Sequence, residues 1–226
     1  MHRGPRSVLA ALVLLGLLVG CGGGDGERDP DSALFAAART GDVSAIRSLV
    51  AAGADVDARD GSGRTPLIIA AQEQMTAAAR ALLDAGADVN AADAKGETAY
   101  PVAALSDNPE LVGLLLDRGA DRIGTKRFGG TPLIAASDRG FVEVVRAILA
   151  RPDIPIDHVN DLGWTALLEA VILGDGGPAH IQVVGLLIEA GADVNLADRD
   201  GVTPLRHARK RGYATMVKRL KSAGAK

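Results

Sequence analysis

The second half of the chain holds side chains of the kinds that bind metals or catalyse hydrolysis, namely His158, His180, His207, Glu169 and Asp175. A zinc-binding helix needs two histidines within one helical turn, and no two of these histidines are that close in sequence. The chain also has no Gly-x-Ser-x-Gly elbow, no His-Glu-x-x-His motif and no Gly-Lys loop for phosphate. We therefore predict a protein that is not an enzyme and that has no metal site and no cofactor.

The chain has one cysteine, Cys21, which follows an apolar run from Val8 to Val19 that two arginines precede. The run is too short to span a membrane as a helix but fits the core of a signal peptide. The sequence Leu18-Val19-Gly20-Cys21 resembles a bacterial lipobox, in which the signal is cut before the cysteine and its thiol is lipidated. We predict a lipoprotein signal peptide over residues 1–20 and lipidation of Cys21 with acyl chains such as palmitate. An ordinary secretory signal or a short anchor with an incidental cysteine is the alternative.

The predicted mature chain is mildly acidic, because removal of Arg3 and Arg6 takes the formal net charge from −3 to −5. This charge argues against general binding of nucleic acid. A lipidated cysteine leaves no thiol for disulfides. Residues 21–30 are glycine-rich and charged, which is typical of a flexible tether. Because Gly22 rather than aspartate follows the cysteine, the resemblance to lipoproteins implies an outer-membrane anchor facing the periplasm in a two-membrane cell. In other cells it implies the outer face of the cytoplasmic membrane.

Two short patterns recur through the rest of the chain. The first is Gly-Ala-Asp, which begins at Gly53, Gly86, Gly119 and Gly191. The second is threonine followed by proline or alanine, at Thr65, Thr98, Thr131, Thr165 and Thr203. From Ser32 through these threonines the steps are 33, 33, 33, 34 and 38 residues. A period in the thirties is typical of a solenoid of stacked repeats.

Each pattern predicts one boundary of a helix. Threonine is a good N-cap and proline suits the first helical turn, so we expect a helix to begin after each threonine, and after Ser32 in the first repeat. A glycine in the left-handed conformation ends many helices, so we expect a helix to end before each Gly-Ala-Asp. The residues between glycine and the next threonine include Asp, Asn and Gly, which favour a projecting turn. The predicted unit is helix, loop, helix, turn.

These motifs closely resemble the ankyrin repeat family from Asp31 to Lys226. The resemblance implies an all-α ankyrin-repeat solenoid of about six helix-loop-helix repeats with projecting β-turn or hairpin tips. We place the repeats near residues 31–60, 61–93, 94–126, 127–160, 161–198 and 199–226. The usual histidine after Thr-Pro-Leu is replaced by Ile68, Pro101, Ile134, Leu168 or Arg206. Because Pro101 interrupts the third repeat and Pro152 replaces the glycine that ends the fourth, we expect local distortion in both.

The resemblance also implies that partners bind the turn tips and the inner helix face. Phe128 and Trp164 are aromatic residues in such turns, and aromatic residues are enriched in binding hot spots. Each could instead pack against a neighbouring loop. The loop of the fifth repeat around residues 174–180 adds five residues to the period, and such insertions often lie on a binding face. The predicted partner-binding residues are Phe128, Asp161, Leu162, Trp164, Glu169, Asp175, His180, Arg199 and Asp200.

Two further features of the C-terminal repeats carry charge. Glu169 and His207 hold equivalent positions in neighbouring repeats, so we expect them to face each other as a polar, hydrogen-bonded pair. Residues 203–226 contain eight lysines and arginines and no acidic residue, which leaves −13 on the rest of the mature chain. A polar outer face is typical of a terminal repeat, and the alternative is a dock for an acidic partner or anionic head groups.

The function predicted from these features is a lipid-anchored protein of the cell envelope that binds another protein, as a scaffold or an accessory. Exported bacterial proteins that resemble it are thought to assist envelope enzymes, including stress-related enzymes such as catalases. The alternative function is a small-ligand or metal-binding envelope protein that uses the fifth-repeat insertion.

Overall fold

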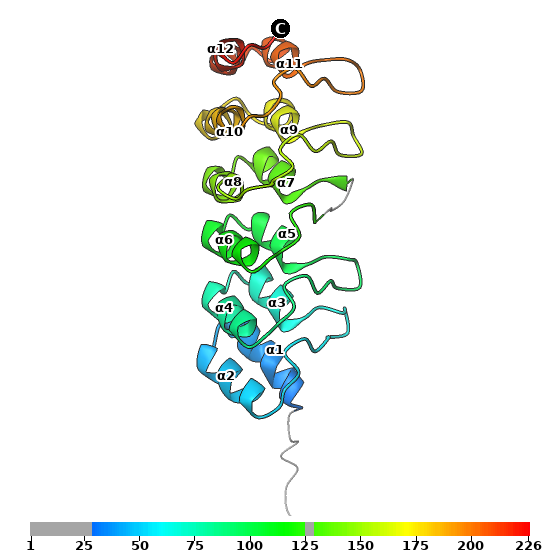
Figure 1. Ribbon diagram of the computed structural model, residues 1–226, viewed down its shortest axis with the longest axis vertical. Coiled ribbons are helices and arrows are strands. Elements are labelled where there is room, and N and C mark those ends of the chain that lie inside the picture. The colour runs from blue at the N-terminus through cyan, green and yellow to red at the C-terminus, as the bar shows by residue number, and fades with distance from the viewer. Residues whose placement is uncertain (1–28, 125–128) are drawn as a thin grey trace, which may run out of the picture.

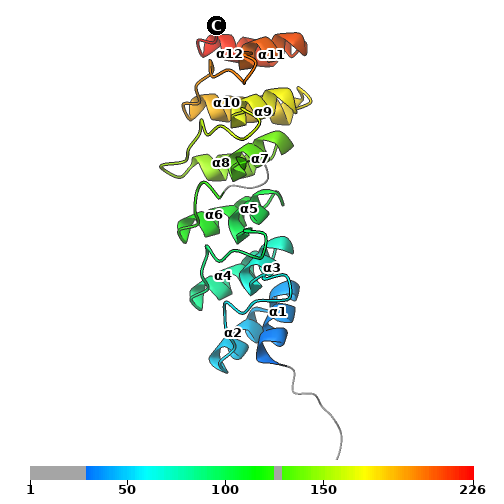
Figure 2. The same cartoon turned by 90° about the vertical axis from the view of Figure 1, so that its right-hand side faces the viewer.

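The computed structural model describes residues 29–124 and 129–226. In this part of the chain, α-helices form six pairs that stack in chain order into an elongated solenoid (Figure 1). A view turned by 90° shows the pairs as successive layers (Figure 2). The helices are α1 (Pro30–Thr40), α2 (Val43–Ala51), α3 (Pro66–Gln72), α4 (Thr76–Asp84), α5 (Ala99–Ala104), α6 (Pro109–Asp117), α7 (Pro132–Arg139), α8 (Val142–Leu149), α9 (Ala166–Ile172), α10 (Pro178–Glu189), α11 (Pro204–Lys210) and α12 (Ala214–Ser222).

The predicted all-α solenoid of six repeats is confirmed over the described ranges. The repeat tips are turns, and no β-strand forms within these ranges. None of the helices described is long and apolar enough to cross a membrane. The signal peptide predicted over residues 1–20, Cys21, the tether up to residue 28 and Phe128 lie outside the described residues.

Threonine side chains begin the first helix of four repeats, as predicted. Thr65, Thr131, Thr165 and Thr203 each accept a hydrogen bond at Oγ1 from the amide three residues later. Thr98 begins α5 without such a bond, and α5 is only six residues long. The first repeat differs from the prediction, because α1 begins at Pro30 with Asp29 as its N-cap. Ser32 therefore lies inside α1, where its hydroxyl donates to the Asp29 carboxylate at 3.2 Å.

Glycines end the second helix of the repeats with Gly-Ala-Asp. Gly53, Gly86 and Gly191 have φ values of 98°, 97° and 95°, in the left-handed region that a residue with a Cβ avoids. The fourth repeat, which lacks this glycine, places Asp153 at φ 61° instead. An aspartate therefore takes the left-handed conformation that glycine has in the other repeats, and this conformation is uncommon for a non-glycine residue.

The core is one apolar layer that continues from Leu34 in α1 to Leu220 in α12. Each repeat contributes large side chains from both helices, as Leu67 and Leu82 do in the second repeat, and both are fully buried. Burying one such side chain stabilises the fold by about 1.5–3 kcal/mol. Because each pair buries its apolar faces against its neighbours, the stack positions the turns that the structure describes in a row along one side (Figure 1).

Polar side chains also join successive repeats. The acceptor is an Asp or Asn side chain that lies two residues after the aspartate of Gly-Ala-Asp. The donor is the main-chain amide at the Gly-Ala-Asp aspartate position of the next repeat. Asp57 accepts from Asp88 at 3.1 Å and Asn90 accepts from Asp121 at 2.9 Å. The same bond joins the fourth repeat to the fifth and the fifth to the sixth. We call this series the inter-repeat ladder.

Candidate functional site

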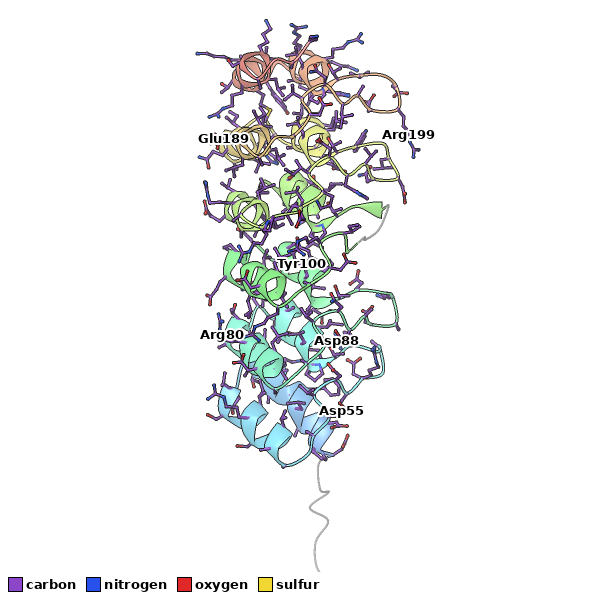
Figure 3. All side chains as sticks on the ribbon, in the orientation of Figure 1. Asp55, Arg80, Asp88, Tyr100, Glu189 and Arg199 are labelled. Carbon is purple, nitrogen blue, oxygen red and sulfur yellow. The ribbon has the colours of Figure 1, made fainter. Side chains whose placement is uncertain are left out.

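The predicted partner-binding residues that the structure describes lie in the fifth and sixth repeats. Asp161, Leu162, Asp175, Arg199 and Asp200 are exposed, Trp164 and His180 are half-buried, and Glu169 is buried. Figure 3 shows Arg199 at the outer edge of its turn, on the side away from Arg80 and Glu189, which lie on second helices. The prediction for Phe128 falls outside the described residues.

Asn160 organises the turn of the fifth repeat. Its Oδ1 accepts from the amides of Leu162 and Trp164, both at 2.9 Å. Aspartates do the same in other repeats, where Asp60, Asp93 and Asp198 each accept from two amides of their own turn. Sequence reasoning missed this role, although the Asp or Asn five residues before Thr65, Thr98, Thr165 and Thr203 was a visible signal; Lys126 holds that position before Thr131.

Glu169 is paired inside its own repeat, and the predicted Glu169–His207 pair is wrong. Because the turn residue of the fifth repeat is Asn160 rather than aspartate, it can also donate, and its Nδ2 bonds Glu169 Oε1 at 2.9 Å. In the sixth repeat His207 Nε2 lies 2.7 Å from Asp198 Oδ2. Burial alone would raise the pKa of Asp198, but the Val202 amide and the His207 ring hold it below its usual value. Each polar helix residue therefore bonds the turn that precedes its helix.

Glu169 is only 5% exposed. Burial and the negative charge of Asp138 on α7 raise the pKa of Glu169 to about 7. The hydrogen bond from Asn160 lowers this pKa but does not offset the other two effects. Its other carboxyl oxygen, Oε2, has no hydrogen-bond partner among the described residues. The site therefore contains a carboxyl group that changes its protonation near neutral pH.

Trp164 is neither fully exposed at the tip nor fully buried under a loop. In the second repeat its position is held by Arg64, which donates to Gln72 at the end of α3 at 2.9 Å. The same register predicts that Trp164 lies along α9, which accounts for its half-buried side chain. The turn that carries Trp164 is also covered by the next repeat, because a Cβ added to Gly163 would lie 2.5 Å from Arg199 Cγ.

Exposed apolar side chains occur at both ends of α9, with Val159 and Leu162 in the turn before it and Leu173 at its C-cap. Val159, Leu162 and Leu173 are 51%, 41% and 50% exposed, and only Leu105 and Ile123 join them as exposed large hydrophobics among the residues described. We define the fifth-repeat surface as Val159, Leu162, Trp164, Glu169 and Leu173. Sequence reasoning missed Val159 and Leu173. Leu173 had a signal, because other repeats place Glu73, Arg139 and Arg211 at its position.

The insertion of the fifth repeat is held between its neighbours. His180 Nδ1 lies 2.9 Å from Asp175 Oδ1, and His180 Nε2 lies 2.9 Å from the main-chain oxygen of Asp138 in the fourth repeat. The amide of Gly177 and the His180 ring hold the pKa of Asp175 below its usual value. On the other side, the Tyr213 hydroxyl donates to the main-chain oxygen of Gly174 at 2.9 Å.

The insertion and the turn therefore form separate regions. The turn precedes the N-terminus of α9 and the insertion follows its C-terminus, so Asp175 and His180 lie at the opposite end of α9 from Asp161 and Leu162. No three potential metal ligands gather at one place among the residues described. The insertion residues bond to one another and to adjacent repeats, and nothing in their arrangement favours the ligand-binding alternative.

Comparison with known proteins identifies the repeats. A family model described as ankyrin repeats (3 copies) matches residues 10–93, 78–160 and 101–198. A putative ankyrin repeat protein of Escherichia coli strain K12, YahD, is 37% identical over 189 residues, covering 84% of this chain and 94% of that protein. Protein phosphatase 1 regulatory subunit 27 of Mus musculus is 39% identical over 87 residues, covering 38% of this chain and 53% of that protein.

Solved structures show the same architecture. An ankyrin repeat domain from Acinetobacter baumannii AYE superposes with a TM-score of 0.81 at 46% identity, covering 85% of this chain and 98% of that one. The ankyrin repeat domain of Bcl-3, titled a member of the IkappaB protein family, superposes with a TM-score of 0.77 at 30% identity, and 88% of each chain is covered. Ankyrin repeats generally bind protein partners, and this chain belongs to the ankyrin repeat family.

Proposed function

We propose that this protein is a lipid-anchored module of the cell envelope that binds a partner protein through its fifth-repeat surface and the adjoining turn of the sixth repeat. The observation that carries the proposal is the exposure of Val159 and Leu162 in the turn that holds half-buried Trp164, with exposed Leu173 at the other end of α9. Contiguous exposed apolar side chains on a soluble surface commonly mark an interaction site. Tryptophan is among the residues most enriched at the centres of such sites.

The anchor in this proposal is Cys21, supported by the lipobox-like sequence that precedes it. The chain from Cys21 to Pro30 can reach at most about 30 Å when fully extended. It joins α1, at the opposite end of the stack from α11 and α12 (Figure 1). An anchor there would leave the fifth repeat near the membrane-distal end, where a partner within the envelope could reach it.

An accessory role to an envelope enzyme, such as a stress-related enzyme, is the form of this function that we favour. The support is limited to resemblance: one relative is named a regulatory subunit of protein phosphatase 1. The chain offers a binding surface and no catalytic constellation that we can identify in the described residues, which suits a regulator or scaffold.

The test is partner capture from envelope extract by matched variants of the full chain. Trp164→Ala should weaken capture by about 30-fold, because a buried aromatic anchor carries about 2 kcal/mol of binding free energy. Lys95→Ala is the control, because Lys95 occupies the tip position of Leu162 in the third repeat and is exposed. Arg64 holds the position of Trp164 in the second repeat, and Arg64→Ala should also leave capture intact. Because this variant loses an ion pair to Asp60, melting curves should first establish that it is folded. Full capture by folded Trp164→Ala would refute the assignment of this surface.

A further inference from the structure

We propose that the fifth-repeat surface binds a segment of the partner protein that combines apolar side chains with one arginine or lysine, and that this cation pairs with Glu169. The inference rests on the proposed function and adds the chemistry of the partner segment. The apolar side chains would cover Val159 and Leu162 in the turn, which are 51% and 41% exposed.

The carboxyl group of Glu169 is hydrogen-bonded to the side chain that organises the turn. Asn160 holds the amides of Leu162 and Trp164 with Oδ1 and holds Glu169 with Nδ2, so one side chain fixes the turn and the carboxylate together. Glu169 uses Oε1 for this bond, which leaves Oε2 without a hydrogen-bond partner among the described residues. A guanidinium or ammonium group is the natural partner for such an oxygen.

The surroundings of Glu169 supply no cation to that oxygen. The fifth repeat, residues 161–198, has no lysine or arginine, and its acidic residues are Asp161, Glu169, Asp175, Glu189, Asp193 and Asp198. On α7, Asp138 adds negative charge and pairs loosely with Arg139 at 3.9 Å.

No described basic side chain of the adjacent elements pairs with Glu169, and Arg211, which follows α11, donates to the main-chain oxygen of Gly174 at 3.1 Å. His207 of α11 bonds Asp198, and His180 of α10 bonds Asp175 and the Asp138 main chain. Arg199 packs its aliphatic stem on Gly163 and makes no ion pair with the acidic residues described. The unpartnered oxygen of Glu169 therefore favours a cationic segment at this position, although residues 203–226 of the next repeat carry eight lysines and arginines. The exposed apolar residues Val159 and Leu162 favour a protein segment over a simple ion.

A cation beside Glu169 requires the carboxylate to be ionised. Because burial and Asp138 raise its pKa to about 7, the free protein must release a proton from Glu169 when it binds the cation at lower pH. A group with this pKa is mostly protonated at pH 6 and mostly ionised at pH 8. The affinity for a cationic segment should therefore rise about tenfold between these two pH values.

Trp164 provides the measurement, because it is the only tryptophan of the chain. The probes are acetylated pentapeptides of leucine and alanine in which one arginine occupies each position in turn, and a matched set in which citrulline, its neutral analogue, replaces arginine. The fluorescence of Trp164 in the full chain is titrated with each peptide at pH 6 and pH 8, for the wild type and for Glu169→Gln.

At least one arginine peptide should bind ten times or more tightly than its citrulline match, and its affinity should rise with pH. Glu169→Gln should abolish both the preference and the pH dependence. Equal binding of both sets, no binding of any arginine peptide, or an unchanged preference in folded Glu169→Gln would each overturn the inference. The proposed function is tested by a different experiment, partner capture by Trp164→Ala, so the two proposals can fail independently.

Discussion

Ile123 and Pro155 stand at the acceptor and donor positions of the inter-repeat ladder between the third and fourth repeats, where the ladder hydrogen bond is missing. The four remaining joints between described repeats all have this bond. Ile123 stands where Asp57 and Asn90 accept, and Pro155 stands where Asp88 and Asp121 donate. The isoleucine side chain has no acceptor and proline has no amide hydrogen, so the acceptor and the donor of this bond are both missing and neither is left unpaired by the other. Arginines provide polar contacts at this joint, as Arg118 also does with Asp84 between the second and third repeats. Arg151 donates to Asp117 at 2.8 Å, and Arg122 donates to the main-chain oxygen of Pro152 at 3.2 Å.

Restoring both ends of this bond should stabilise the joint, whereas restoring one should not. The double variant Ile123→Asn, Pro155→Asp should show a favourable coupling of about 1 kcal/mol in urea melts, which is the net value of a typical hydrogen bond. Each single variant lacks its partner and should be neutral or destabilising. A double variant whose effect equals the sum of the singles would show that the ladder register assigned here is incorrect.

Loss of a threonine cap should cost stability only where the cap bond exists. Thr131→Ala removes a buried hydroxyl that accepts from the Ile134 amide, and should lower the free energy of unfolding by about 1 kcal/mol. Thr98→Ala is the matched control, since Thr98 begins α5 without a side-chain cap bond and should lose clearly less. Lys95→Ala, at an exposed tip, should stay within about 0.5 kcal/mol of the wild type. Equal losses in the two threonine variants would contradict this account.

Glu169 should make the protein less stable as the pH rises. Its pKa is about 7 in the folded state against 4.5 for an ordinary glutamate, so the unfolded chain loses this proton at lower pH than the folded chain does. The free energy of unfolding therefore falls between pH 4.5 and pH 7 on account of this group.

Glu169→Gln removes this titration and keeps an oxygen that can accept from Asn160. Relative to the wild type, the variant should gain on the order of 1–3 kcal/mol between pH 4.5 and pH 8. Urea melts of both proteins at the two pH values measure the difference, in which the titration of all other groups cancels. An offset that stays the same at both values would mean that Glu169 titrates normally.

Cys21→Ser tests the proposed anchor. The variant should accumulate as an unprocessed precursor without lipid, because the serine hydroxyl cannot replace the acylated thiol. Metabolic labelling with a palmitate analogue and separation of membrane from soluble fractions measure the result. A variant that is processed and retained on the membrane like the parent protein would exclude a lipoprotein and leave an ordinary signal or a short anchor.

The amino-acid sequence by itself determined the repeat architecture. Thr131 followed by proline and Gly86 followed by Ala-Asp each fix a helix boundary through contacts a few residues away, and such local signals are readable without the fold. The apolar spacing of residues such as Leu67 and Leu82 likewise required them to meet in a core. Even so, the start of α1 was misplaced by three residues, because Asp29 and Pro30 provide an equally local signal that precedes Ser32.

The tertiary structure alone decided which polar and apolar side chains meet. Equivalent positions suggested that Glu169 and His207 face each other, but the turn residues Asn160 and Asp198 reach them first. The insertion of the fifth repeat was predicted to form part of a binding edge, which stays a prediction, and only the structure shows that His180 reaches the main chain of Asp138, 42 residues earlier. The physical reason is that periodicity fixes the position of a side chain within its repeat, whereas its partner depends on distances of about 3 Å across the joints. Those distances are set by how the repeats stack.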